Sequence, residues 1–284
     1  MKKIVLFGLL VGVFQSVLAT ASAEIPSNFQ RENLVAWCIA HRWDAKGRDA
    51  AERAELMADL GFGRYAYNWR ASDNPQFEEE ILECRKRGIE FFAFWNEHET
   101  AFDLFQKYKM QPQIWKVSPS PKVEGQAAKV EAAAKRMYPY AKRAQEIGCS
   151  FGLYNHMNWG GHPENMIAVC EALREMGCEN VGIVYNFHHS HEEMDRFAEY
   201  LDMMMPYLMC LNLNGMADKD TVDHKKLVNK ILPIGSGKHE QRMLQAVLDS
   251  GYDGPVGILD HIVAQDSEKS LRDNLEGLDT FFER

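Results

Sequence analysis

The stretch that decides the fold runs from Phe151 to His189 and reads FGLYNHMNWGGHPENMIAVCEALREMGCENVGIVYNFHH. It begins with a short apolar segment, Phe151–Tyr154, and ends with a second one, Val181–Tyr185. Between them, Glu164–Met176 carries apolar side chains at the i, i+3, i+4 and i+7 spacing of a helix that buries one face. The stretch therefore predicts a strand, a helix and a second strand parallel to the first, because parallel neighbours need such a crossover.

The same alternation continues in both directions along the chain. The expected strands are Leu34–Ile39, Arg64–Trp69, Ile89–Trp95, Gln113–Val117, Phe151–Tyr154, Val181–Tyr185, Leu208–Leu213 and Val256–Leu259. The expected helices are Ala50–Leu60, Pro75–Arg87, Thr100–Lys109, Gly125–Ile147 with a bend or restart at Pro139, Glu164–Met176, Glu192–Met203, Glu240–Ser250 and Ser267–Phe282. Eight such units predict a single-domain (β/α)8 TIM barrel. An open doubly wound sheet also alternates in this way, but no G-x-G-x-x-G follows the first strand.

The composition of the 284 residues is that of an ordinary globular protein. Hydrophobic residues make up 46% and charged residues 26%, which excludes a disordered chain, a collagen and a disulfide-stapled miniprotein. The formal net charge of −9 argues against nucleic acid as a partner, because phosphate binding needs a clustered basic face.

The first residues have the pattern of a cleavable secretory signal peptide. Two lysines precede an apolar run, Ile4–Leu18, and the A-x-A site Ala21–Ala23 lies directly before Glu24. The run of about 15 residues is shorter than the roughly 20 that span a bilayer. We therefore predict a signal peptide over 1–23, a barrel domain over 24–284, export to the periplasm or medium, and no stable membrane anchor. Loss of the two lysines would change the net charge from −9 to −11.

Export permits disulfides, yet the six cysteines lie within or beside predicted strands and helices. None has the C-x-x-C spacing of a zinc or redox site. We expect them to be small buried hydrophobic side chains. One bridge that involves Cys149 or Cys178 remains an alternative.

Polar side chains gather where the predicted strands end, which is the face that carries the active site in such barrels. Seven of the ten histidines fall there: His41, His98, His156, His188, His189, His191 and His261. We expect His156, His189 and His261, which follow three different strands, to point into one cavity, and we add Glu97 as a catalytic candidate. The substrate-binding candidates are Lys46, Arg70, Trp95, Lys116, Trp159, Asn186, His188, Asn212 and Asn214. His191 is expected to open a helix and to be exposed.

Four indoles also lie near this predicted rim, those of Trp69, Trp95, Trp115 and Trp159. Sugar rings stack on aromatic faces while their hydroxyls need amide, imidazole and charged partners. The combination indicates a carbohydrate ligand. Plain core packing is the alternative, because large aromatic side chains dominate cores as well.

Several segments resemble the xylose isomerase-like TIM barrel family, which includes sugar phosphate isomerases and epimerases. They are GLYNHMNWGGHPEN (152–165), VGIVYNFHHSH (181–191), CLNLNGM (210–216), LPIGSGKHE (232–240) and GYDGPVGILDH (251–261). The resemblance extends over the whole predicted mature chain, from WCIAHRWDAKGR onward, and is nearest to exported members of the superfamily. It implies a barrel enzyme that moves a proton next to a carbonyl group of a sugar.

The resemblance also implies a divalent metal, held in this family by Glu, Asp, His or Gln, and Glu on strands five to eight. Those positions fall here on Tyr154, Asn186, Asn212 and Leu259. Hard cations prefer carboxylate oxygens, so the usual metal is in doubt. A softer ion such as zinc could instead bind His156, His188, His189 and His261, with Asp260 as a carboxylate. A metal-free histidine cluster is the alternative.

The resulting expectation is an exported isomerase- or epimerase-like enzyme with histidine as acid and base. Lys46, Lys116 and Glu97 would polarise or hold the substrate. Export favours a free sugar, an oligosaccharide or a keto-glycoside over a phosphorylated sugar. The alternatives are a lyase or hydrolase of 3-keto-glycosides, which starts with the same proton abstraction, and a non-catalytic carbohydrate-binding barrel. An endonuclease is disfavoured by the acidic charge and the missing ligands.

Overall fold

The structure is a computed structural model that describes residues 25–40, 43–262 and 265–284. The predicted signal peptide and His41 lie outside these residues. Eight parallel strands follow each other in chain order and close, so that β1 pairs with both β2 and β8, and the predicted barrel is confirmed. The strands are β1 (Leu34–Trp37), β2 (Arg64–Tyr67), β3 (Glu90–Trp95), β4 (Gln113–Val117), β5 (Phe151–Tyr154), β6 (Val181–Asn186), β7 (Leu208–Leu213) and β8 (Val256–Leu259).

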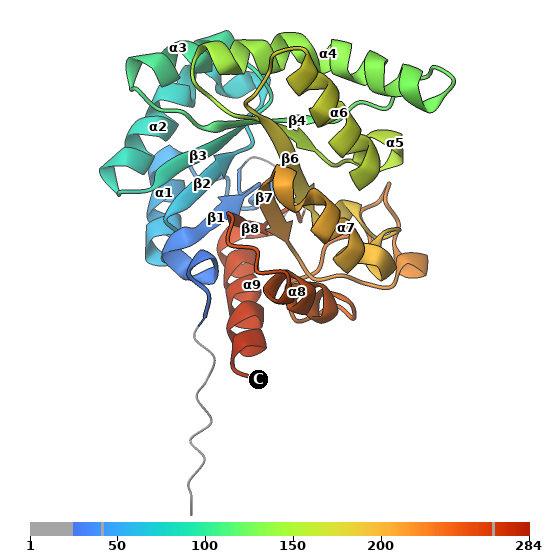
Figure 1. Cartoon of the computed structure of the whole chain (residues 1–284). Coiled ribbons are helices and arrows are strands. Elements are labelled where there is room, and N and C mark those ends of the chain that lie inside the picture. Colours follow the sequence, from blue (N-terminus) through green and yellow to red (C-terminus); the bar gives the residue numbers. More distant parts are fainter. Residues whose placement is uncertain (1–24, 41–42, 263–264) are drawn as a thin grey trace, which may run out of the picture.

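Helices surround the strands on the outside of the barrel (Figure 1). They are α1 (Ala50–Asp59), α2 (Phe77–Lys86), α3 (Glu99–Lys107), α4 (Gln126–Glu146), α5 (Asn158–Gly161), α6 (Pro163–Glu175), α7 (Phe197–Met204), α8 (Glu240–Asp249) and α9 (Ser267–Phe282). The helix α1 begins with a capping box, in which Asp49 and Glu52 each accept a hydrogen bond from the other's backbone N–H. The helices carry the chain back to the end of the barrel where the next strand begins. All eight strands therefore run in the same direction, and their carboxyl ends lie at one face.

The core has two parts, because successive side chains of a strand point to opposite sides of the sheet. One part packs the outward side chains against the helices. The other fills the barrel interior and includes Trp37, Trp115, Tyr154, Cys210 and Leu259. The large interior rings need small neighbours: a Cβ added to Gly152 would lie 2.6 Å from Val184 and 3.1 Å from the Trp115 ring.

Two helices differ from the sequence expectation. The helix α4 is continuous through Pro139, which is exposed. The Lys135 carbonyl, left without its i+4 donor, lies on the solvent side, so the missing hydrogen bond costs little there. The expected helix at Glu192 begins only at Phe197, because His191 and Glu193 turn inward: His191 is buried, not exposed, and Glu193 pairs with His162 at 2.9 Å.

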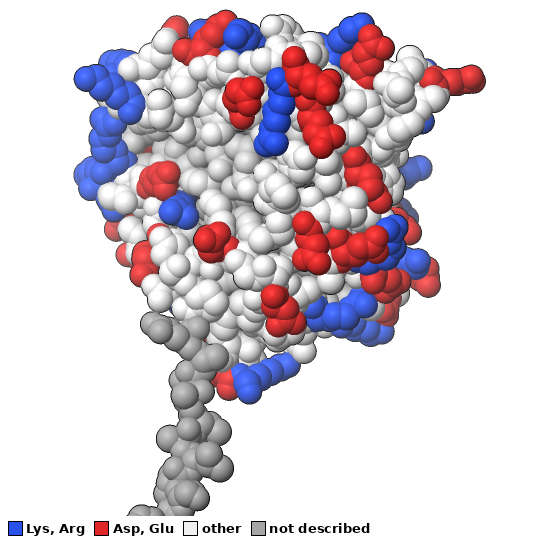
Figure 2. Space-filling view, viewed as in Figure 1, with Lys and Arg blue, Asp and Glu red and all other residues white. Residues whose placement is uncertain are grey.

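Charges of both signs are interspersed over the surface shown in Figure 2. Each helix of the described residues is too short or too polar to cross a membrane. All six cysteines are buried, and burial raises the pKa of the Cys149 and Cys170 thiols to about 12.

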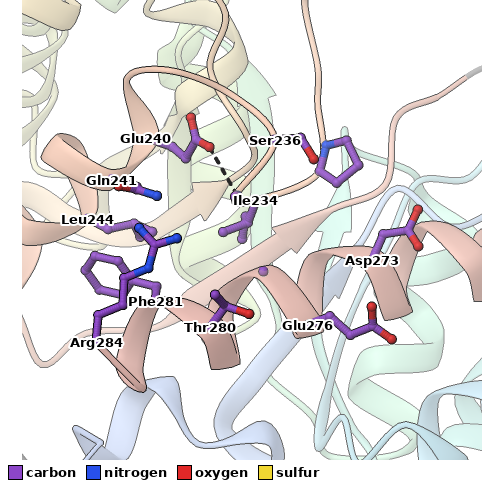
Figure 3. A pocket seen from close by; sticks show the side chains of 13 residues that line it. Ile234, Ser236, Glu240, Gln241, Leu244, Asp273, Glu276, Thr280, Phe281 and Arg284 are labelled. Carbon is purple, nitrogen blue, oxygen red and sulfur yellow. Dashed lines mark hydrogen bonds between the residues drawn. The ribbon is translucent and has the colours of Figure 1, made fainter.

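A crevice of about 330 Å³ lies between α8 and α9 (Figure 3), with Leu244 on one side and Thr280 on the other. None of the strand-end residues that are candidates for catalysis or binding lines this crevice.

Candidate functional site

A cavity of about 520 Å³ opens at the carboxyl ends of the strands, within the size range of small-molecule sites. Strand-end residues form its walls, and the long connection from β7 to α8 covers part of it. Its lining includes Trp37, Cys38, Trp43, Asn68, Arg70, Trp95, Tyr154, His156, His188, His189, His224, Lys225, Lys226, Lys230 and His261. The three histidines expected to share a cavity, His156, His189 and His261, all line it.

The histidine rings form a continuous row along the cavity. The His156 and His189 ring centroids are 4.2 Å apart, those of His189 and His188 3.8 Å, and those of His188 and His261 5.7 Å. The row thus links the ends of β5, β6 and β8. One small substrate can therefore contact several imidazoles at once.

Burial and positive neighbours keep three histidines of this row, His156, His188 and His189, neutral. Burial, together with the nearby Lys230 and other histidines, lowers the pKa of His188 and His189 well below 6.5. Burial also lowers the pKa of His156, and Lys230 adds to the effect. A neutral imidazole has a free nitrogen lone pair, so these side chains can accept a proton at neutral pH.

Lys230 lies at the centre of these interactions and is only 4% exposed. Burial lowers its pKa to about 8, so its ammonium form still predominates at pH 7. It is held in place by its chain neighbour Ile231, which packs into the barrel interior. Two residues of the same turn, Leu227 and Asn229, adopt positive φ angles of 59° and 54°. Such backbone strain is concentrated at functional sites.

His261 is fixed from two sides. Its ring stacks on the buried indole of Trp43 with 3.5 Å between centroids, and its Nδ1 lies 3.0 Å from the Sγ of Cys38. Cys38 follows β1 directly and has a φ of 68°, a conformation that is rare for a residue with a side chain. This turn aims the thiol at the imidazole and so helps to hold the ring at the cavity wall.

Aromatic side chains form the floor of the cavity. Tyr154 packs edge-on against Trp95, with 4.9 Å between ring centroids, and its hydroxyl accepts a hydrogen bond of 3.2 Å from Trp37 Nε1. Of the four indoles expected at a sugar-stacking rim, only that of Trp95 lines the cavity. Trp115 is buried inside the barrel, and Trp159 donates to Gln126 at 2.9 Å.

Two of the positions at which the family resemblance implies metal ligands, Asn186 and Asn212, belong to a ladder of amides. Asn212 Nδ2 donates to Asn186 Oδ1 at 2.8 Å, and Asn186 Nδ2 donates to Asn155 Oδ1 at 2.7 Å. The remaining Asn212 oxygen faces the Cys210 thiol at 3.6 Å. A Cβ at Gly257 would lie 1.9 Å from that oxygen, so the glycine makes room for the amide.

These residues do not fit a divalent cation. The Asn155 and Asn186 oxygens already accept hydrogen bonds from neighbouring amides, and the Asn212 oxygen faces the Cys210 thiol. Tyr154 is a phenol and Leu259 has no donor atom, whereas such a cation needs carboxylates to replace its hydration shell. In the described part of the chain, no three His, Cys, Asp or Glu side chains are placed to share a metal ion. Asp260, expected as a carboxylate for a softer ion, faces Ser267 and Ser270 of α9 instead, and burial raises its pKa to about 7.

Several residues expected at the site lie elsewhere. Lys46 is drawn away by Asp266, at 2.9 Å, and lines a different surface hollow. Lys116 and Glu97 form an ion pair at 2.7 Å outside the cavity. Asn214 is buried and donates to the Gly215 carbonyl at 2.8 Å. Arg70 and His188 do line the cavity, as expected of substrate-binding residues.

Sequence reasoning did not single out Lys230, Cys38, Trp43 or Asn68 as site residues. Lys230 lies in the connection from β7 to α8, which has no periodicity that predicts its position. The sequence predicts for Cys38 only a small buried hydrophobic side chain. Asn68, directly after β2, carried the available signal, a polar side chain at a strand end. It is 1% exposed, and neither amide atom has a partner among the described residues.

Comparisons with known proteins agree with this architecture. A family model described as "Xylose isomerase-like TIM barrel" matches residues 33–281. The structure is similar to the 3-keto-D-glucoside 4-epimerase of E. coli, with a TM-score of 0.62, 14% identity and coverage of 87% of this chain and 98% of that one. It is also similar to the D-psicose 3-epimerase of Clostridium cellulolyticum H10, solved with D-tagatose. The TM-score is 0.58, the identity 16%, and the coverage 87% of this chain and 96% of that one. A third similar structure is a xylose isomerase-like TIM barrel protein of Mycobacterium smegmatis in complex with magnesium. Its TM-score is 0.54, the identity 15%, and the coverage 86% of this chain and 90% of that one. No curated protein sequence matches the chain.

Proposed function

We propose, because this chain belongs to the xylose isomerase-like TIM barrel family, that it is a sugar isomerase or epimerase whose histidine cavity moves a proton next to a carbonyl. The observation that carries the proposal is the row of neutral imidazoles beside the buried Lys230 in one cavity. Two similar structures bear the names of sugar epimerases, which supports a sugar as the substrate.

The first step is the removal of a proton from the carbon next to the carbonyl. A neutral His189 or His156 accepts the proton, the C–H electron pair forms the C=C bond of an enediolate, and the carbonyl oxygen takes the negative charge. The Lys230 ammonium group stabilises that charge in a site with little water, where its effect is strongest. An isomer results when the hydroxyl proton on the adjacent carbon's oxygen moves to the enediolate oxygen and the carbon-bound proton returns to the former carbonyl carbon, so that the carbonyl group changes place.

Return of the proton to the opposite side of the same carbon gives an epimer. This needs a second group across the substrate, and His261, from β8, is the candidate because the ring row connects it to the β5 and β6 histidines. Trp43 and Cys38 fix its orientation. The residues at the family's metal position do not fit a cation, so every step is assigned to side chains of this chain.

A second reaction starts with the same proton abstraction. If the substrate is a 3-keto-glycoside, the electron pair of the carbanion forms a C=C bond to the anomeric carbon and the glycosidic C–O bond breaks. The leaving oxygen takes the proton from the protonated histidine, which gives β-elimination in place of isomerisation. The name of the E. coli neighbour, a 3-keto-D-glucoside 4-epimerase, favours 3-keto sugars as test compounds. We propose export of the mature chain from Glu24 as the setting, which N-terminal sequencing of the secreted protein would test.

The test is proton exchange followed by NMR. The protein is incubated in D2O with aldoses, ketoses and 3-keto-glucosides, and deuterium uptake next to the carbonyl is measured together with products. We expect exchange with at least one class and a loss of about 100-fold or more in His189→Gln, since general acid–base groups contribute that much. His239→Gln is the matched control, because His239 lies outside the cavity and bonds Asp218 at 2.8 Å. Sugar binding without exchange in any class would refute an enzyme and leave a carbohydrate-binding barrel.

A further inference from the structure

Positively charged side chains line the cavity, and no Asp or Glu of the described residues does so. Arg70 reaches it from the end of β2, and Lys225, Lys226 and Lys230 reach it from the connection between β7 and α8. This local excess contrasts with a chain whose formal net charge is −9. It is therefore a property of the cavity and does not reflect the overall composition.

Lys230 shows that the excess is not neutralised inside the protein. Cations that are shielded from water elsewhere have partners: the buried Arg53 pairs with Glu80, and the half-buried Arg48 pairs with Asp44 at 2.8 Å. Lys230 is 4% exposed, yet no carboxylate of the described residues pairs with it. The charged groups that act on the neighbouring His188 and His189 are also basic. A buried charge without a counterion is costly, so the cavity as a whole favours a ligand that carries negative charge.

Arg70 presents the geometry for that anion. Its Nη1 donates to the backbone carbonyls of Asn68 and Trp69, both at 2.8 Å. These neutral acceptors hold the guanidinium group without cancelling its charge. Within the described chain, the Nε and Nη2 donors of the same group make no hydrogen bond. This edge matches the two oxygens of a carboxylate in a parallel, bidentate pair.

Other groups around this edge complete a polar site. Asn68 leaves its amide oxygen and nitrogen without a partner among the described residues, although it is buried against the cavity. Lys226 is partly neutralised at the rim by Asp223, with 3.7 Å between the charged atoms, and its side chain is largely exposed. The rim lysines therefore attract an anion, while Arg70 and Asn68 are placed to bind it.

We propose that the substrate is an acidic sugar whose carboxylate binds the Nε and Nη2 edge of Arg70, with Asn68 beside it. The inference rests on the proposed function of the cavity as a sugar site. The anionic group is distinct from the reacting carbonyl, because Lys230 serves the reacting end and Arg70 the charged end. A neutral sugar would leave both the Arg70 edge and the Asn68 amide without partners, which disfavours its binding.

Calorimetric titration of the full-length mature protein tests the proposal. The ligands are D-glucuronate and D-galacturonate, each paired with the neutral D-glucose or D-galactose, and D-glucose 6-sulfate as a non-planar anion. We expect each uronate to bind at least about 10-fold more tightly than its neutral partner and more tightly than the sulfate. Arg70→Gln should weaken uronate binding by about 10- to 100-fold, since hydrogen bonds to charged groups have that strength, and change neutral-sugar binding less than about 2-fold.

The matched control is Arg143→Gln on α4, where the partly exposed guanidinium group pairs with Glu99 at 2.7 Å; this variant should bind as the wild type does. Uronates that bind no better than neutral sugars, or equally well to Arg70→Gln, would overturn the proposal. Tighter binding of the sulfate would overturn the carboxylate assignment. Failure of the proposed function is separate: uronate binding lost in Arg70→Gln but with no proton exchange in D2O would support an acidic-sugar site and refute the enzyme. Proton exchange with neutral sugars only would support the enzyme and refute the acidic-sugar site.

Discussion

Replacement of Lys230 by methionine should make the protein more stable and less active at the same pH. Burial lowers the pKa of this lysine from 10.5 to about 8. That change corresponds to at most about 3 kcal/mol of free energy against the charged form. Because the cavity admits some water, we expect about 1–2 kcal/mol to be recovered when an apolar side chain of similar length replaces the ammonium group.

The stability difference between Lys230→Met and the wild type should depend on pH in a definite direction. Below pH 8 the amine is protonated in both the folded and the unfolded chain, so the folded wild type bears the full cost of the buried charge. Between pH 8 and 10.5 the folded protein loses this proton while the unfolded chain keeps it, so the wild type regains stability. The advantage of Lys230→Met should therefore be full at pH 7 and vanish by about pH 10.5.

Thermal unfolding of wild type and variant across this pH range is the assay. A domain of this size gains about 2–4 °C in Tm per kcal/mol, so we expect an increase of about 2–8 °C at pH 7. Proton exchange with the best substrate should fall by about 100-fold or more, because the enediolate loses its counter-charge. Lys135→Met, which replaces an exposed lysine of α4, is the control and should change Tm by less than about 2 °C. A lower Tm for Lys230→Met at pH 7 would refute the description of Lys230 as a buried cation without a partner.

Four further predictions concern other features. The rate of proton exchange should fall as pH rises through about 8, where Lys230 loses its proton, and Lys230→Arg should move that limb above about pH 9; an unchanged limb would exclude this lysine. Gly257→Ala should cost about 1–3 kcal/mol of unfolding free energy, because its Cβ would lie 1.9 Å from Asn212 Oδ1, and Asn212→Ala should restore part of it in urea titrations. Arg53→Met should cost about 3–5 kcal/mol by leaving buried Glu80 unpaired, whereas the double replacement of both residues should recover most of this loss. Elemental analysis should find magnesium and manganese below stoichiometric amounts, and EDTA should leave proton exchange unchanged, because the amide ladder directs its polar atoms to one another and to neighbouring side chains; stoichiometric manganese that is lost in Asn186→Ala would contradict this assignment.

The sequence alone determined the architecture and the face that carries the site. The apolar pattern repeats a strand followed by a helix eight times, and the strand bounds observed differ from the predicted ones by at most two residues. Parallel strands joined by helices all end at one face, so the polar residues that follow Tyr154, Tyr185 and Leu259 had to meet there. The grouping of His156, His189 and His261 in one cavity could be predicted for this reason.

The charged residues that line that cavity can be identified only from the folded structure. Lys46 and Lys230 are both lysines of irregular connections, yet Asp266 draws Lys46 to the surface while Lys230 is buried without a carboxylate among the described residues. The difference depends on partners that are remote in the sequence and on how one long connection packs Ile231 into the barrel. Local periodicity holds no information about either, because both follow from contacts that exist only once the barrel has closed.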